Sequence, residues 1–498
     1  MIFICTDPSC QAAAEGETRI RCPRCGKPMK SVSEEALTGD QWCELGIFWR
    51  DRQTEEADLR AIECFRQAAK RGSACGISNL GICMEYGFGT KSDIRQAFWL
   101  YRQAAEYEYV PAFCHLGDCY ARGSGTEKDP EQAFQYYMKA ADLGYARAQL
   151  RVGRAYETGM GVERDLAQAF FWYRFAAMEG DPQGFLELGM CYRFAKGVTE
   201  DPDAAAKWFK KAADAGMAEG MLRYGVCLIL GYGVEADARQ AAEYYRMAGD
   251  HGDPLGYVNL SGCYMSGTGV LKNETKAVEL AERAADMGSA EGYRQLGMYY
   301  WNGTGVEKDI SMSAKMFLEA AKLGHVACMD HVGWLYMKGK GVRKDFGRAF
   351  HWFTEAAKNG SRYARVQLGE CYLKGFGTER DIEKGLALVK EGAEEENDFA
   401  MFLYGECLER GTGISPDFDA ALALYQKAAE KGGEEGLYRM ALLYSTGTGV
   451  EKNMEKAREY CKKVREDLTY SDTCVFEGEW KDAIQSLLRE LRADEGDR

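Results

Sequence analysis

A composite motif returns through this sequence at a constant interval of 36 residues, and this period constrains the fold more than any other feature. Its marker is a Gly-x-Gly element, in which Ala195 alone replaces the first glycine. The first glycines of the other copies are Gly87, Gly123, Gly159, Gly231, Gly267, Gly303, Gly339, Gly375, Gly411 and Gly447. A period of this length indicates supersecondary units that stack and bury their apolar faces against their neighbours. The sequence therefore predicts a solenoid of repeats.

An Asp or Asn lies four residues beyond the second glycine of every copy, where it predicts the N-cap of a helix. Such a side chain accepts hydrogen bonds from the free amides of the first helical turn. The caps are Asp93, Asp129, Asp165, Asp201, Asp237, Asn273, Asp309, Asp345, Asp381, Asp417 and Asn453. Pro130 and Pro202 follow two of them, at the first helical position that proline favours. A helix of about fourteen residues is expected after each cap.

Apolar residues spaced by three and four indicate that each of these helices has one buried face. In one copy the aromatic pair Tyr136-Tyr137 precedes the small pair Ala140-Ala141, and Gly144 ends the helix. A further helix follows at once and carries Leu-Gly, usually with Tyr three residues later. Each unit thus contains a Leu-Gly helix, here called the first helix, and an Asp-capped second helix. The expected fold class is all-α.

The full pattern is Leu-Gly-x-x-Tyr-x-x-Gly-x-Gly-Val-x-x-Asp, followed by an aromatic pair and Ala-Ala, and Leu296 to Ala321 shows nearly all of it. It resembles the Sel-1-like repeat family, close relatives of tetratricopeptide repeats, over about residues 41–466. The resemblance implies a right-handed α/α superhelical solenoid of about twelve helix-loop-helix repeats. It also implies an adaptor that assembles other proteins.

The composition along the chain divides it into four parts. Residues 1–32 form a cysteine-bearing front end, and residues 33–72 a linker with a degenerate first repeat. Residues 73–466 hold eleven repeats of the 36-residue motif. We expect residues 467–498 to form a C-terminal capping helix and a tail.

Two close cysteine pairs in residues 1–32 predict a metal site. Cys5-x4-Cys10 and Cys22-Pro-Arg-Cys25 supply four thiolates, which suit one tetrahedral Zn²⁺ ion. The second pair resembles a zinc-ribbon knuckle, while the first has a wider spacing. Because so short a segment has little apolar core, the ion would be structural. The alternatives are two disulfides or four free thiols.

The chain carries 63 basic and 77 acidic residues, a net charge of −14 that repels phosphate backbones. Nucleic acid is therefore an unlikely partner of the repeats, and basic peptides or proteins suit them better. The front end has a mild basic excess, which a four-thiolate zinc site would cancel. It is interpreted as a cap or a partner-docking knuckle, and a nucleic-acid-associated regulator that uses the ribbon is the alternative.

Seven of the eighteen cysteines occupy one repeat position, so their spacing tests for a disulfide scaffold. Equivalent helices of neighbouring repeats should lie roughly 10 Å apart, beyond the separation that a disulfide tolerates. The remaining cysteines of the repeats, among them Cys43, Cys64 and Cys75, form no second column. All are therefore expected to be buried free thiols in a reducing compartment. Without a membrane-spanning stretch or a signal-peptide start, we expect a cytoplasmic protein with no membrane insertion.

No catalytic constellation is visible in the sequence. Five histidines are few, no His-x-x-x-His occurs, and no nucleophile-elbow motif is present. The Gly-x-Gly loops lack the further glycines and the strand that phosphate-binding motifs need. The expectation is a non-enzyme, although a site formed between distant repeats in the groove remains an alternative.

Comparison of the repeats with one another suggests where a partner would bind. Positions that vary between copies on the first helix are free to serve recognition, and in tetratricopeptide-like stacks this helix lines the concave face. We expect a protein or peptide partner in this groove, with Trp and Arg as anchors. The candidate contacts form two polar patches, namely His115, Arg151, Arg154 and Arg223, and His331, Trp334 and Lys338.

Overall fold

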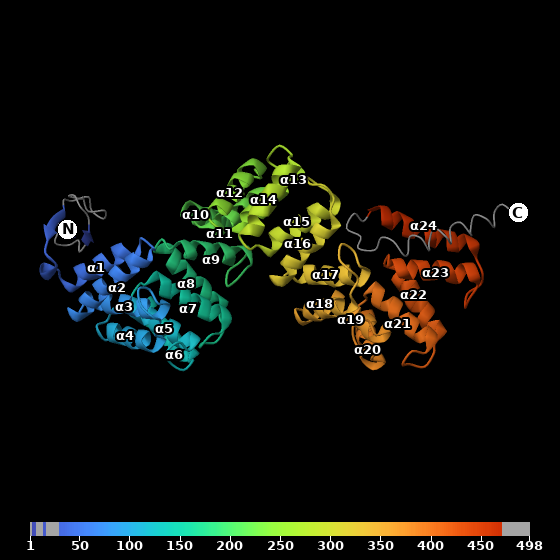
Figure 1. Cartoon of the computed structure of the whole chain (residues 1–498), viewed down its shortest axis with the longest axis horizontal. Helices are drawn as coiled ribbons and strands as arrows, with labels where there is room; N and C mark the ends of the chain where they lie inside the picture. Colours follow the sequence, from blue (N-terminus) through green and yellow to red (C-terminus); the bar gives the residue numbers. More distant parts are fainter. Residues whose placement is uncertain (1, 6–12, 16–28, 471–498) are drawn as a thin grey trace. The chain divides into compact units, whose positions relative to one another are not determined.

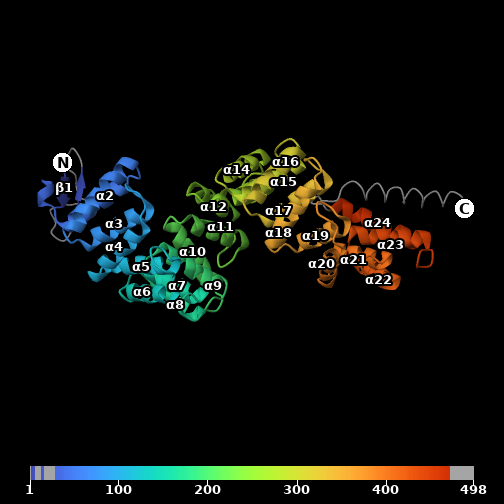
Figure 2. The same ribbon diagram turned by 60° about the horizontal axis from the view of Figure 1, so that its bottom comes forward.

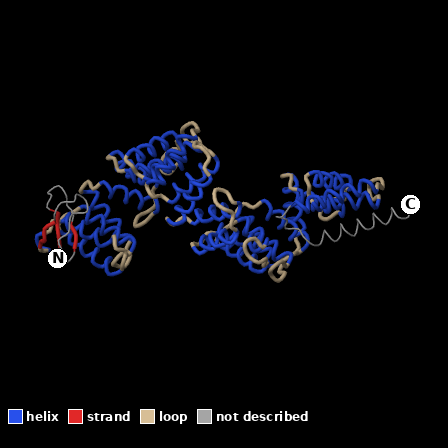
Figure 3. The backbone as a smooth tube through the Cα atoms, turned by 90° about the horizontal axis from the view of Figure 1, so that it is seen from above, coloured by secondary structure: helices blue, strands red, loops and turns tan. Residues whose placement is uncertain are grey.

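The structure is a computed structural model that describes residues 2–5, 13–15 and 29–470. Helices make up most of these residues, in two compact units, Met1–His251 and Gly252–Arg498. Figure 1 shows consecutive helices running back and forth as pairs, and Figure 3 shows that the strands are confined to the front end. The prediction of an all-α repeat fold is confirmed for the body of the chain.

Six helix pairs form the first unit, and the loops between their helices are visible in Figure 2. Its first helices are α1 (Gly39–Arg50), α3 (Ala74–Tyr86), α5 (Val110–Arg122), α7 (Ala146–Thr158), α9 (Pro182–Arg193) and α11 (Ala218–Leu230). Its second helices are α2 (Glu55–Lys70), α4 (Ile94–Glu106), α6 (Pro130–Asp142), α8 (Leu166–Met178), α10 (Pro202–Asp214) and α12 (Ala238–Asp250).

Six further pairs form the second unit. Its first helices are α13 (Pro254–Ser266), α15 (Ala290–Asn302), α17 (Val326–Lys338), α19 (Arg362–Lys374), α21 (Asp398–Arg410) and α23 (Glu434–Thr446). Its second helices are α14 (Glu274–Asp286), α16 (Ile310–Lys322), α18 (Phe346–Lys358), α20 (Ile382–Glu394), α22 (Phe418–Glu430) and α24 (Met454–Tyr470). Within each unit, first helices of successive repeats contact one another, as α7 contacts α9 and α19 contacts α21.

A small antiparallel sheet precedes the helices. Its strands are β1 (Ile2–Cys5), β2 (Ala13–Glu15) and β3 (Met29–Val32), in the order β2-β1-β3. Ile2 and Ile4 are each 8% exposed and join the core of the first repeats. A single 3-10 turn, Glu34–Ala36, then leads into α1.

The predicted caps are confirmed at all eleven positions, from Asp93 to Asn453. In one repeat Asp309 accepts a hydrogen bond from the Met312 amide at 2.9 Å, which opens α16. Its own N–H donates to the Tyr300 carbonyl at 2.9 Å and closes the loop. Gly303 and Gly305 turn this loop with φ of +73° and +72°, values that favour glycine.

In most repeats the glycine of the Leu-Gly pair, or of its equivalent, lets a ring of the same repeat reach the first helix, whereas Gly369 faces Val389. A Cβ on Gly333 would lie 2.6 Å from the Phe353 ring, which is fully buried. Where serine replaces this glycine, at Ser261, the ring position holds Ala281 instead. Close packing of this kind is typical of protein cores. It explains why a repeat with a ring at this position of the second helix has glycine at the facing position of the first helix.

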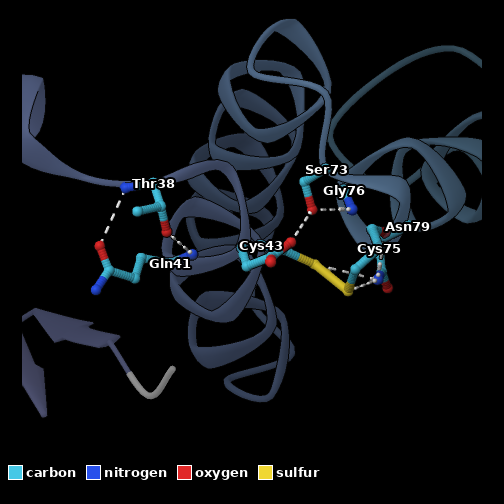
Figure 4. The surroundings of a disulfide bond; sticks show 8 residues. Thr38, Gln41, Cys43, Ser73, Cys75, Gly76 and Asn79 are labelled. Carbon is cyan, nitrogen blue, oxygen red and sulfur yellow. Dashed lines mark hydrogen bonds between the residues drawn. A yellow bond between two sulfur atoms is a disulfide. The ribbon is translucent and has the colours of Figure 1, made fainter. Parts of the chain in front are cut away.

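The cysteines follow the prediction with one exception. Eleven described cysteines are free and buried, including the seven of the repeat column. Cys43 of α1 and Cys75 of α3, however, form a disulfide with a Cα separation of 6.3 Å (Figure 4). The prediction of free thiols is therefore wrong for this pair. Gly46 of α1 corresponds to Gly81 of α3, so the repeat equivalent of Cys43 is Ser78, and Cys75 lies three residues before it.

Candidate binding cavity

A cavity of about 220 Å³ opens within the second unit over four successive first helices, α17, α19, α21 and α23. The side chains that line it are Trp334, Met337, Lys338, Gln367, Glu370, Lys374, Phe399, Phe402 and Glu435 from these helices, with Lys344, Phe346 and Phe376 beside them. First helices contribute because they contact one another directly in this unit. The constant period brings the same helical face of four repeats to one place.

Aromatic rings form much of the wall. Phe346 and Phe376 stack with centroids 4.5 Å apart, and Phe399 and Phe402 stack at 6.3 Å. Trp334 is only 3% exposed, and its indole Nε1 is buried without a hydrogen-bond partner in the described part of the chain. A buried donor without an acceptor costs free energy.

The charged groups of the cavity differ in how they are compensated. The Lys374 Nζ lies 2.7 Å from the Glu370 carboxylate, and the Lys344 ammonium lies 4.9 Å from the centre of the Phe346 ring. Glu435 is only 6% exposed. Burial, with nearby acids, raises the pKa of its carboxyl to about 7. This carboxyl is therefore poised between its neutral and charged forms near neutral pH.

The second predicted patch lies partly inside the protein. The His331 ring packs 4.3 Å from Phe317 and 5.6 Å from Trp301, and burial lowers its pKa to about 4. His331 is thus neutral at physiological pH. Trp334 is buried rather than presented on an open surface, as an anchor would be, whereas Lys338 is exposed at the end of α17. Trp334 and Lys338 both line the cavity, and their role as partner contacts remains a prediction.

His115 repeats the arrangement of His331 six repeats earlier. Its ring stacks on Tyr101 with centroids 4.8 Å apart, and Tyr101 occupies the position that Phe317 occupies beside His331. Burial lowers the pKa of His115 to about 4. Both histidines therefore pack as neutral rings against the second helix of the preceding repeat.

A second hollow, of about 290 Å³, lies in the first unit between α7, α8 and α9. It brings together Arg151 and Arg154, two residues of the first predicted patch. Arg154 lies 3.4 Å from the Glu187 carboxylate of the next repeat. The Arg223 guanidinium pairs with Glu219 of its own helix at 3.0 Å, and no contact of the described residues joins it to Arg151 or Arg154.

Asp118 of α5 is the acid that pairs with Arg147 and Arg151 of this hollow. It is 7% exposed and accepts a hydrogen bond from the Tyr137 hydroxyl at 2.8 Å. Its carboxylate lies 3.1 Å from Arg151, 3.5 Å from Arg147 and 3.6 Å from Arg122. The arginines of the first patch therefore already have acidic partners within the chain.

The cysteines of the repeat column are poor nucleophiles. Burial raises the pKa of Cys119, Cys191 and Cys371 to about 12 in each case. Such thiols stay protonated at neutral pH. Among the residues described, no three His, Cys, Asp or Glu side chains gather closely enough to hold a metal ion.

The predicted zinc ligands fall mostly outside the description. Cys5 ends β1, while Cys10, Cys22 and Cys25 lie outside the described residues. The sheet carries Cys5 at the end of its central strand. The four-cysteine zinc ribbon and its ion therefore stay a prediction.

Sequence reasoning missed Glu435 and the rings of Phe346, Phe376, Phe399 and Phe402. The rings resemble ordinary packing aromatics, because only the folded stack brings them to one cavity. Glu435 was missed because Arg439 stands four residues after it, the spacing of an ion pair, although Arg439 pairs with Glu409. No helix in the described ranges is both long and apolar enough to cross a bilayer.

The constant period and the paired helices define an α-helical repeat protein in which successive repeats stack on one another, and the cavity lies over its first helices. The chain belongs to the Sel1 repeat family. The family model of the Sel1 repeat matches residues 48–73, 76–106, 112–145, 146–181, 186–217, 218–253, 254–289, 290–325, 326–361, 362–397, 398–433 and 434–463. Proteins of this family are generally protein-interaction scaffolds and are typically non-catalytic.

Two solved structures illustrate the similarity. One is c5321 of uropathogenic Escherichia coli, described as a protective antigen with an SLR fold, at 29% identity and a TM-score of 0.51, covering 86% of this chain and 94% of that one. Another is a Sel1 repeat protein from Oxalobacter formigenes, at 28% identity and a TM-score of 0.49, covering 64% and 93%. No curated protein matches the sequence.

Proposed function

We propose that this protein is a non-catalytic scaffold that binds a partner protein or peptide over the first helices of its repeats. The observation that carries the proposal is the cavity of about 220 Å³ over α17, α19, α21 and α23. Four repeats contribute to it, and it combines rings, a buried indole donor and a buried carboxyl. Aromatic side chains with a few placed polar groups are typical of recognition sites.

A capture experiment tests this role. We expect Phe346→Ala with Phe376→Ala to reduce partner recovery on the immobilised chain at least fivefold, because it removes one wall of the cavity. The matched control is Phe171→Ala with Phe175→Ala, which removes another ring pair with centroids 4.5 Å apart, from the second helix α8. Recovered proteins are quantified by mass spectrometry, after circular dichroism has confirmed folding of both variants. Equal recovery with the cavity variant and the parent chain would contradict the proposal.

For the front end we propose one structural Zn²⁺ ion held by Cys5, Cys10, Cys22 and Cys25. The support is the donor set, since zinc prefers four thiolates in two close pairs. Elemental analysis of the purified chain should give one zinc per chain, lost in Cys22→Ser with Cys25→Ser and retained in Cys64→Ser. A chain that carries no zinc after purification without chelator would overturn this assignment.

A further inference from the structure

Glu435 differs from its repeat equivalents in lacking a cation. Glu219 and Glu291 occupy the same position of their first helices, and each pairs with an arginine of its own helix, at 3.0 and 2.6 Å. The corresponding arginine beside Glu435 is Arg439, which instead pairs with Glu409. Glu435 is therefore a carboxyl that is buried without a cationic partner among the described residues.

The groups that face Glu435 do not compensate its charge. Its own backbone amide is a hydrogen-bond donor to it, and the nearby acids are Glu434 of the same helix, Asp398 of α21 and Glu370 of α19. Of these acids, Glu370 is already neutralised by its ion pair with Lys374. The Tyr363 hydroxyl on α19 is a further titratable group near it, and Lys338, Lys344 and Lys374 line the same cavity. A buried ionised carboxylate without a cation is unfavourable, so a ligand that supplies one is favoured.

The rest of the cavity indicates which cation fits. Rings attract cations over their faces, and a planar guanidinium stacks on rings better than an ammonium does. Phe346, Phe376, Phe399 and Phe402 line the same cavity as Glu435, and Lys344 and Lys374 already lie 4.9 and 5.9 Å from the centres of the Phe346 and Phe376 rings. The net charge of −14 also favours a basic ligand.

The lysines of the cavity limit the ligand. Lys338, Lys344 and Lys374 line it as well, and like charges disfavour a polybasic run at this place. A single arginine beside an acidic residue meets both conditions, because its guanidinium faces Glu435 while the acid faces the lysines. A cavity of about 220 Å³ has room for one long side chain rather than for several.

We propose that this cavity binds one arginine side chain of a partner peptide, with the Glu435 carboxylate as its counter-ion and the surrounding phenylalanine rings as its walls. This inference rests on the proposed scaffold function and names the chemistry of the partner. The recognised unit is a lone arginine with an acidic neighbour in a peptide segment.

The test uses the full chain and the peptide acetyl-Asp-Arg-Gly-amide, with a citrulline peptide as its uncharged analogue. Isothermal titration at pH 8.5 should show the arginine peptide binding at least tenfold more tightly than the citrulline peptide. At pH 5.5 the affinity should fall by roughly tenfold or more, because the pKa of Glu435 is about 7 and the carboxyl is then largely protonated. Equal binding of the two peptides, or affinity independent of pH over this range, would overturn the inference.

Variants assign the effect to Glu435. E435Q should lower the affinity for the arginine peptide at least tenfold and remove its pH dependence, whereas E291Q, at the equivalent position, should leave both unchanged. Circular dichroism verifies folding, and the pH series on the unaltered chain is an independent test if E435Q does not fold. Parent-like binding by E435Q would refute the assignment. If the arginine peptide does not bind as predicted but the phenylalanine variant still reduces partner capture, the arginine inference is wrong and the proposed scaffold function is retained.

Discussion

Ala195 occupies a position at which the ten other copies of the motif carry glycine. Its φ is +53°, in the left-handed region, where the equivalent Gly231 has +65°. An L-residue with a Cβ pays roughly 1–2 kcal/mol there. Ala195→Gly should therefore stabilise the chain by about 1 kcal/mol, measured as a higher thermal unfolding midpoint. Gly231→Ala should act in the opposite direction, and an unchanged or lower midpoint for Ala195→Gly would contradict this account.

Glu435 predicts a pH dependence of stability in the free protein. Its folded pKa is raised from 4.5 to about 7 by burial. The stability that it contributes is therefore fully present below pH 4.5 and falls as pH rises through 7, and the loss reaches about 3 kcal/mol above that. Glu435→Gln should be more stable than the parent at pH 8 and about equal near pH 4.5, by chemical denaturation.

Glu219→Gln is the control for this measurement, because Glu219 is exposed and paired. A stability difference for Glu435→Gln that is the same at both pH values would mean that the carboxyl does not titrate as described. A cost of this kind in the free protein is typical of groups kept for binding rather than for stability.

The site was only partly predictable at the level of single residues. Two of the expected contact residues on the first helices, Trp334 and Lys338, do line the cavity. The burial of the Trp334 side chain was not predictable, because it depends on rings from neighbouring repeats. Glu435 could have been found by asking which acid of its column lacks an arginine partner, although Arg439 stands at the right spacing and only the structure shows it paired with Glu409.

At the scale of helices, the Asp caps and the left-handed glycines were predictable because both are local. Cap bonds and loop turns depend on a few consecutive residues and on no other repeat. The sheet of β1, β2 and β3 was not foreseen, since its strands are three or four residues long and lie among glycines, prolines and cysteines. The bond between α1 and α3 was missed because it joins positions that are not repeat equivalents.

The Cys43–Cys75 disulfide should stabilise the first repeats. A cross-link over a separation of 32 residues lowers the conformational entropy of the unfolded chain. In the chain-entropy estimate this raises the free energy of unfolding by about 3–4 kcal/mol. Cys43→Ser with Cys75→Ser, or reduction of the parent, should therefore lower the unfolding midpoint, while Cys64→Ser with the bond intact serves as control. No change on reduction would show that the bond contributes nothing to folding.

The state of this pair in the native cell also bears on the predicted cytoplasmic location. Disulfides persist in oxidising compartments and are rare in reducing ones. Thiol labelling of freshly lysed cells, followed by mass spectrometry of the Cys43 and Cys75 peptides, distinguishes the two. A fully reduced pair agrees with the cytoplasmic prediction, and a fully oxidised pair contradicts it.

At the scale of the whole chain, the repeat architecture explains how a surface for binding arises from local rules. Each repeat contacts mainly its neighbours, and equivalent positions line up on the first helices. Packing positions stay constant, as the glycine under each ring does, while the positions of the cavity differ from repeat to repeat. The second unit thereby acquires one cavity whose rings, indole and carboxyl come from several repeats.

Photo-crosslinking in the native cell tests the central claim, that a partner is bound over the first helices. A photoreactive residue replaces Lys338 or Lys374 at the cavity, or Lys390 on the exposed side of the second helix α20 as control. We predict that both cavity positions crosslink to the same partner protein and that position 390 does not. Crosslinking at position 390 equal to that at the cavity, or none at either cavity position, would contradict the account.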